Sequence, residues 1–261
     1  MIAMANDSIL TLTPPPADVR LPYGGDRNQF GDLRFPKSGG PFPVVMMIHG
    51  GYWRAKYGLL PAGNLCAALT AKGLATWNVE YRRVGDPGGG WPGTFQDIGA
   101  AFRYISQFAK RYNLDASRIV VMGHSAGGQL AICLAAHQPS VKHVVSLAGV
   151  LDLQAAYEQH LSDDAVVEFL GGTPKQVTDH YRDADPMELS IPKATAQWII
   201  HGLADDVVPP NFSREYVQKK RAKGEDVHLL EIAEAGHFEL IDPRSAAWSK
   251  VEGVVRHEAG A

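Results

Sequence analysis

The stretch Gly123-His124-Ser125-Ala126-Gly127 sets a serine between two glycines, directly after the apolar run 118–122 and before the helix-like segment 128–136. This order predicts a strand, a very tight turn and a helix, because side chains at the two glycine positions would clash in so tight a turn. The strain of such a turn lifts the serine hydroxyl clear of the sheet. Glycine and serine also occur in ordinary turns, so the segments on both sides carry the prediction.

Short apolar runs alternate with longer periodic segments along the chain, which is typical of βαβ units and a mostly parallel sheet. One domain is expected over residues 1–261, because a single core rarely grows beyond roughly 250–300 residues. The expected buried strands are residues 44–48, 75–81, 118–122, 143–147, 197–201 and 227–232. Residues 8–13 and 29–35 are expected to add antiparallel edge strands. The predicted fold is therefore α/β, with a mostly parallel eight-stranded sheet flanked by helices.

Residues 150–192 interrupt this alternation, because they hold no obvious strand. A connection of this length usually forms a lid or a binding element. We expect a short cap insertion here, within the single domain, and we expect its shape to decide which substrates reach the site.

The composition excludes several classes of partner. A net charge of −3 gives no basic surplus for nucleic acid or anionic lipid. No stretch approaches the roughly 20 apolar residues that span a bilayer, and residues 1–7 lack the basic and apolar parts of a signal peptide. Cys66 and Cys133 lie in apolar helical patterns, which favours buried thiols over a disulfide or a metal pair. We expect a cytoplasmic protein with no nucleic-acid and no membrane partner.

Candidate partners for Ser125 follow two later strands of the predicted sheet. A serine hydroxyl becomes a nucleophile when a base takes its proton and an acid orients that base. In a strand–turn–helix context the acid precedes the base along the chain, and both lie just after strand ends. Asp205 and its neighbour Asp206 follow one strand, and His237 follows the next. We assign Asp205 as the acid, with Asp206 as the alternative, and His237 as the base.

A second loop is expected to stabilise negative charge on a substrate oxygen. The strand 44–48 runs into His49-Gly50-Gly51-Tyr52, and glycines after a buried strand let backbone N–H groups approach such an oxygen. The expected donors of this oxyanion hole are the N–H groups of Gly51 and Tyr52, together with that of Ala126 after the nucleophile. For the Gly-Gly pair alone, a plain turn is the alternative.

No metal ion and no cofactor are expected. The chain has neither an H-E-x-x-H nor a C-x-x-C motif. The glycine-rich stretch 85–90 lacks the G-x-x-x-x-G-K-[ST] pattern of a phosphate-binding loop. It is interpreted as a surface loop.

Residues 49–53 (His-Gly-Gly-Tyr-Trp), 123–128 (Gly-His-Ser-Ala-Gly-Gly) and 237–239 (His-Phe-Glu) together resemble the kynurenine formamidase (arylformamidase) branch of the α/β-hydrolases. That branch is close to the hormone-sensitive-lipase-like carboxylesterases. The resemblance extends from Tyr23 to the last helix, and it implies hydrolysis without a cofactor. The implied substrates are N-formyl aromatic amides or small aryl and acyl esters.

By position, the resemblance assigns the nucleophile to Ser125, the acid to Asp205 and the base to His237. The lipase-like relatives carry His-Gly-Gly-Gly in the oxyanion loop, whereas this chain has Tyr52 in place of the third glycine. The substitution keeps the backbone N–H and narrows the space beside it.

The sequence thus predicts a serine hydrolase that cleaves a carboxylic ester or an N-formyl aryl amide through an acyl-enzyme. Trp53, Trp91 and Phe238, together with Tyr52, are candidates for an aromatic wall that binds the substrate, and packing is the alternative role for each. A small serine peptidase, an acyltransferase and a non-catalytic ligand receptor of the same fold are the alternative functions. The expected partner is a small ester or amide, and a homodimer is left open beside a monomer.

Overall fold

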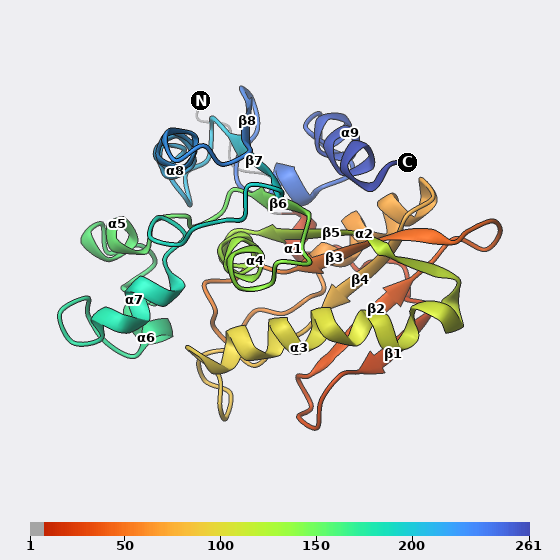
Figure 1. Cartoon of the computed structure of the whole chain (residues 1–261), viewed down its shortest axis with the longest axis horizontal. Coiled ribbons are helices and arrows are strands. Elements are labelled where there is room, and N and C mark those ends of the chain that lie inside the picture. The colour runs from red at the N-terminus through yellow and green to blue at the C-terminus, as the bar shows by residue number, and fades with distance from the viewer. Residues whose placement is uncertain (1–7) are drawn as a thin grey trace.

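Eight strands form one sheet in residues 8–261, the part of the chain that the computed structural model describes (Figure 1). The expectation about a signal peptide in residues 1–7 lies outside the described residues. The strands are β1 (Val19–Pro22), β2 (Phe30–Arg34), β3 (Phe42–Ile48), β4 (Ala75–Val79), β5 (Leu114–His124), β6 (His143–Leu147), β7 (Ala196–Gly202) and β8 (Val227–Ile232). Their order is β1-β2-β4-β3-β5-β6-β7-β8. The β1–β2 and β2–β4 pairs are antiparallel and the other pairs are parallel, which confirms the predicted fold class.

Helices cover both faces of the sheet. They are α1 (Ser8–Thr11), α2 (Ala62–Ala71), α3 (Gly93–Phe108), α4 (Ala126–His137), α5 (Leu153–Glu158), α6 (Ala165–Leu170), α7 (Thr178–Ala184), α8 (Asn211–Ala222) and α9 (Trp248–Ala259), with 3-10 turns η1 (Ala109–Tyr112) and η2 (Glu239–Ile241). Side chains of α3, α4 and α8 pack on one face, and those of α2 and α9 pack on the other. Because both faces are covered, the central strands are continuously apolar; every residue of β3 is buried.

The predicted edge strand at residues 8–13 is wrong. This segment instead forms the single helical turn α1, and β1 at Val19–Pro22 takes the edge position beside β2. The alternating Ile, Leu and Thr residues fit a strand, but only Ile9 faces the core. Its side chain is fully buried in the same apolar cluster as Leu65 of α2. A single buried anchor is compatible with one turn of helix, so the alternation alone was misleading.

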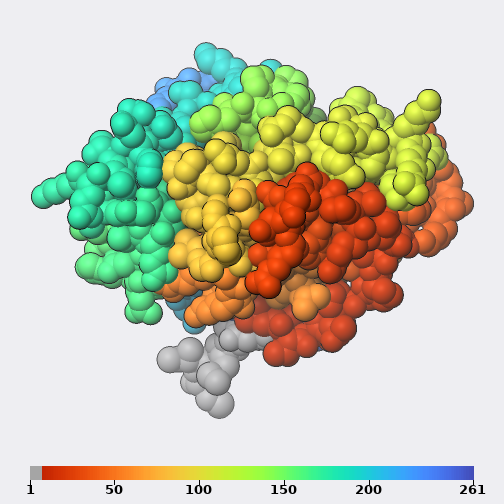
Figure 2. Space-filling view, turned by 90° about the horizontal axis from the view of Figure 1, so that it is seen from below, coloured from red at the N-terminus to blue at the C-terminus, as the bar shows by residue number. Residues whose placement is uncertain are grey.

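Residues 150–192 hold α5, α6 and α7 and no strand. In Figure 2 these helices, coloured green to turquoise, form the surface at one end of the molecule. The loop before α3 and α3 itself, in yellow, separate them from the red β1–β2 region. The cap-like segment 150–192 is therefore separate, in this view, from the β1–β2 end of the molecule.

The connections of the parallel strands bring four loops to one edge of the sheet. The loop after β3 begins at His49, the turn after β5 holds Ser125, and the loops after β7 and β8 hold Asp205 and His237. Carboxyl ends of parallel strands meet at the same edge, where open α/β sheets form their sites. Residues far apart in the sequence thus share one site.

Candidate active site

Ser125 lies on a strained turn between β5 and α4. Its φ is +56°, in the left-handed region that side chains rarely adopt. A Cβ on Gly123 would lie 2.0 Å from the carbonyl oxygen of Gly127, and a Cβ on Gly127 would lie 2.1 Å from that of Ile48. Both positions therefore require glycine, which is the steric reason that the sequence pattern gave for the turn.

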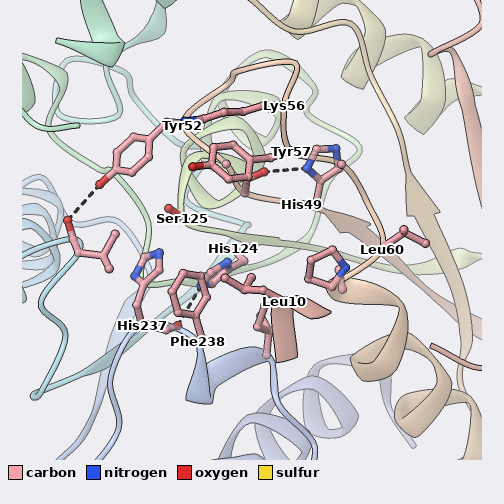
Figure 3. A pocket seen from close by; sticks show the side chains of 17 residues that line it. Leu10, His49, Tyr52, Lys56, Tyr57, Leu60, His124, Ser125, His237 and Phe238 are labelled. Carbon is pink, nitrogen blue, oxygen red and sulfur yellow. Dashed lines mark hydrogen bonds between the residues drawn. The ribbon is translucent and has the colours of Figure 1, made fainter. Parts of the chain in front are cut away.

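His237 and Asp205 form a buried pair beyond the ends of β8 and β7. Nδ1 of His237 donates to Oδ2 of Asp205 over 2.7 Å, and both side chains are shielded from solvent. Since Nδ1 carries this proton, Nε2 keeps the lone pair that a base needs. In Figure 3 the His237 ring faces the Ser125 side chain across the pocket. Nucleophile, base and acid are thus within one site.

Further donors hold the Asp205 carboxylate in place. Oδ1 accepts from the backbone N–H groups of Val207 at 2.9 Å and Val208 at 2.8 Å, and Oδ2 lies 3.2 Å from Nε2 of His201. Burial on its own would raise the pKa of Asp205. The hydrogen bonds from His201, His237 and the backbone outweigh burial and hold this pKa well below its usual range. The carboxylate stays ionised and keeps His237 oriented.

The neighbouring Asp206 is exposed on the surface of the same loop. The structure brings Asp205, and not Asp206, into hydrogen-bond contact with His237. His201 supports the same loop. Its ring donates to the carbonyl of Val208 at 2.9 Å and lies 2.6 Å from the hydroxyl of Ser213 in α8. These contacts fix the loop between β7 and α8, which holds Asp205 and is called the acid loop below.

The loop after β3 lies against the nucleophile. A Cβ on Gly50 would be 2.9 Å from the Cβ of Ser125, and Gly51 has a φ of +113°. Within residues 8–261, none of the N–H groups of Gly51, Tyr52 and Ala126 donates to another backbone group. These three predicted donors are therefore available to a substrate oxygen, which is what an oxyanion hole requires.

Tyr52 bridges the oxyanion loop and the acid loop. Its hydroxyl donates to the carbonyl of Val207 over 3.0 Å, as the dashed line in Figure 3 marks. Burial raises the pKa of this phenol well above its ordinary value, with the nearby Asp205 carboxylate adding to the effect. Tyr52 is thus a fixed, uncharged wall of the site.

A cavity of about 540 Å³ opens in front of Ser125 (Figure 3). Ser125, His237, His124 and the loop 49–52 line its inner part. The remaining lining residues are Leu10, Lys56, Tyr57, Gly58, Leu60, Pro61, Ala62, Val207, Phe238 and Ile241. Phe238 therefore lies where the sequence suggested a substrate contact, with its ring edge-on to that of His237.

Trp53 and Trp91 do not line this cavity, which corrects the predicted aromatic wall. Trp53 is 1% exposed; its ring stacks on Phe169 of α6, and its Nε1 donates to Gln129 over 3.0 Å. Trp91 packs against Phe95 and Phe169. Both indoles thus pack against side chains of α6, and Trp91 also against α3. Packing was the alternative role that the sequence left open for these two residues.

The residues that complete the cavity were not found from the sequence. No lining residue comes from 150–192, so the expectation that this segment shapes the substrate pocket is wrong for the described residues. Its contact with the site is indirect: Arg54 donates to Glu168 over 2.7 Å and to Ser162 over 3.2 Å. The outer wall comes instead from α1 and residues 56–62. Neither segment carries a motif, and Leu10 lies in the stretch that was predicted as an edge strand.

Within residues 8–261, no group of three or more His, Cys, Asp or Glu side chains is arranged to hold a metal ion. No helix in this range combines the length and apolar character needed to cross a membrane.

Several known proteins with similar sequences or structures are named esterases or carboxylic ester hydrolases. The chain is 29% identical to "Esterase LipC" of Mycobacterium tuberculosis over 85% of this chain and 60% of LipC. It is 27% identical to "Probable carboxylic ester hydrolase LipM" of the same species, over 81% of this chain and 53% of LipM. The chain thus spans little more than half the length of these relatives.

A solved structure described as a truncated carbohydrate esterase from gut microbiota superposes with a TM-score of 0.81. The superposition covers 96% of this chain and all of that chain at 20% identity, and it shows a shared fold. Residues 32–219 match the model of the family described as BD-FAE. Because this match covers most of the chain, the protein belongs to the BD-FAE family, in the carboxylesterase branch of the α/β-hydrolases.

Proposed function

We propose that this chain is a serine hydrolase that cleaves carboxylic esters. The observation that carries the proposal is the buried 2.7 Å hydrogen bond between Asp205 and His237, whose ring faces Ser125. A base oriented by an acid and directed at a serine is the arrangement that acyl transfer to serine needs. The esterase names of both curated relatives support an ester as the substrate.

In the proposed reaction, Oγ of Ser125 attacks the ester carbonyl carbon while Nε2 of His237 takes its proton. Asp205 stabilises the imidazolium through the bond to Nδ1. The carbonyl oxygen gains the negative charge and accepts hydrogen bonds from the N–H groups of Gly51, Tyr52 and Ala126.

His237 then returns its proton to the alcohol oxygen as the carbon–oxygen bond breaks, and the acyl group stays on Ser125. In the second half, His237 takes a proton from water, and the resulting hydroxide attacks the acyl carbonyl. The acid is released and Ser125 recovers its proton. No cofactor takes part in either half.

A labelling experiment with a kinetic measurement tests this proposal. A fluorophosphonate should modify wild-type protein at Ser125, and Ser125→Ala should lower turnover of p-nitrophenyl butyrate by at least about 10³-fold. Ser140→Ala, at an exposed serine outside the cavity, is the matched control. Full activity in Ser125→Ala would overturn the assignment. Labelling without turnover of any ester would favour a ligand receptor of the same fold.

Cleavage of an N-formyl aryl amide is the second candidate function. The rings of Tyr52 and Phe238 line the cavity on opposite sides of Ser125 in Figure 3, where an aryl group could stack between them. Rates on N-formylkynurenine and p-nitrophenyl butyrate, measured side by side, separate the two functions. A formamidase should prefer the formamide by orders of magnitude, whereas an esterase should prefer the ester.

A further inference from the structure

The outer half of the cavity is apolar. Leu10, Leu60, Pro61 and Ile241 line it, and among residues 8–261 no lining residue is Asp, Glu, Asn, Gln, Arg or Thr. Lys56, at the mouth, is the one lysine in the lining, and its ammonium lies over the Tyr57 ring at 5.0 Å. Hydroxyl-rich ligands depend on such polar side chains for their hydrogen bonds, and here they are missing from the wall.

Three of the polar side chains that line the cavity are already engaged. Tyr52 donates to Val207, His124 donates to the carbonyl of His237, and His49 donates through Nε2 to Glu80 over 2.9 Å. A sugar hydroxyl brought into this space would lose hydrogen bonds to water and gain few from the protein, which is unfavourable. The wall therefore favours an apolar ligand.

Exposed apolar side chains gather at the mouth of this cavity. Five large apolar side chains are exposed within residues 8–261, and three of them, Leu10, Tyr57 and Leu60, line the cavity. Such a concentration beside a reactive serine marks a binding surface rather than chance exposure.

The helical turn α1 holds Leu10 in this position through contacts on both sides. Ile9 is fully buried beneath it, the Ser8 hydroxyl accepts from Arg244 at 2.8 Å, and the Leu12 carbonyl accepts from Asn64 at 3.1 Å. Figure 3 shows Leu10 beside Phe238, across the cavity from Tyr57. Leu10 is thus a fixed part of the wall, although 40% of its surface is exposed.

We propose that α1 forms the outer wall of the substrate site and that Leu10 and Leu60 select esters carrying an extended apolar group, an alkyl chain or an aryl ring, over acetylated sugars. The inference rests on the proposed esterase function and deepens it. The apolar group lies against Leu10 and Leu60 while the ester carbonyl is held at Ser125. The group belongs either to the acyl part or to the alcohol part of the ester, and the test distinguishes the two.

The test compares three sets of substrates by kcat/KM. The acyl set is p-nitrophenyl acetate, butyrate and octanoate; the alcohol set is ethyl and octyl acetate; the sugar set is an acetylated methyl xyloside. In wild-type protein, kcat/KM for the long-chain ester of either the acyl or the alcohol set should be at least about tenfold higher than kcat/KM for the short ester of that set. It should exceed kcat/KM for the xyloside by the same factor, which is the scale of methylene contacts in an apolar pocket.

Leu10→Ala should lower the long-to-short ratio in that set by about tenfold. Leu12→Ala is the matched control, because Leu12 is similarly exposed, at 37%, and lies outside the cavity. It should keep the ratio within twofold. Leu60→Ala, at the other exposed leucine of the mouth, should act like Leu10→Ala and provides the second variant if thermal melting shows that Leu10→Ala is unfolded.

Two results would overturn the inference while the esterase function stands. One is a long-to-short ratio that is the same in wild type, Leu10→Ala and Leu60→Ala. The other is an acetylated xyloside that is cleaved faster than every long-chain ester. Failure of the proposed function is distinct, because it would appear as no turnover of any substrate and no labelling of Ser125.

Discussion

His124 donates through Nε2 to the backbone carbonyl of His237 over 3.0 Å, and the centroids of the two rings lie 4.5 Å apart. The residue before the nucleophile in sequence thus supports the base. Burial, together with repulsion from His237, lowers the pKa of His124 to about 3. The ring therefore stays uncharged near neutral pH and acts as a fixed donor behind the base.

We expect His124→Ala to lower kcat for p-nitrophenyl butyrate by about tenfold, or about 1.4 kcal/mol, which is the scale of one lost hydrogen bond. KM should change less than kcat, because the lost contact positions His237 rather than the substrate. His124→Gln, which retains an N–H donor, should recover part of the loss. A kcat equal to wild type in His124→Ala would show that the contact does not position the base.

Asp205→Asn should lower kcat by about 10⁴-fold, since an amide cannot hold His237 in the tautomer that leaves Nε2 free. Asp206→Asn is the control one residue away, and it should retain activity within twofold because Asp206 is exposed and does not contact His237. Initial rates of ester hydrolysis by both variants measure this directly. A large loss in Asp206→Asn with little loss in Asp205→Asn would reverse the assignment of the acid.

The sheet and the reacting groups could be predicted because their signals are local. Strands β6 and β8 coincide with the predicted ranges 143–147 and 227–232, since each is a short stretch of mainly apolar residues. The turn at Ser125 requires glycine on both sides for steric reasons. The order of acid and base follows from the order of the strands.

The substrate pocket could not be predicted, because it depends on where neighbouring side chains point. Tyr52 and Trp53 are adjacent and both have positive φ, at 50° and 56°. In this turn the Tyr52 ring lines the cavity, whereas the Trp53 ring packs in the core on Phe169. Leu10 reaches the site because its neighbour Ile9 is anchored in an apolar cluster whose other members are far away in the sequence. Neither fact has a local sequence signal.

Trp53→Phe should therefore affect stability rather than substrate choice. The change leaves the buried Oε1 of Gln129 without its 3.0 Å donor, and an unpaired buried acceptor costs about 1–3 kcal/mol. Thermal or denaturant unfolding measures the loss. The relative kcat/KM values for acetate, butyrate and octanoate esters should stay as in wild type. A changed preference among these esters would instead place Trp53 in the substrate site.

Asp185 should make stability depend on pH. Burial raises the pKa of this carboxyl to about 7, despite hydrogen bonds from the backbone N–H groups of Gln154 and Met187. In the unfolded chain an aspartate titrates near about 3.9, so between these two values the folded state binds more protons. The free energy of unfolding then falls as the pH rises from about 4 to about 7 and is constant above that range.

Asp185→Asn removes this titration, so the Tm of the variant relative to wild type should be higher at pH 8 than at pH 5. For a chain of this size, each kcal/mol corresponds to roughly 2–4 °C in Tm. The comparison of two pH values cancels any fixed effect of the amide on its backbone donors. Asp179→Asn, at an exposed position in α7, the helix that ends just before Asp185, should give the same difference in Tm from wild type at both pH values. If Asp185→Asn also gave the same difference in Tm from wild type at pH 5 and at pH 8, this carboxyl would already be ionised in the folded protein at pH 5.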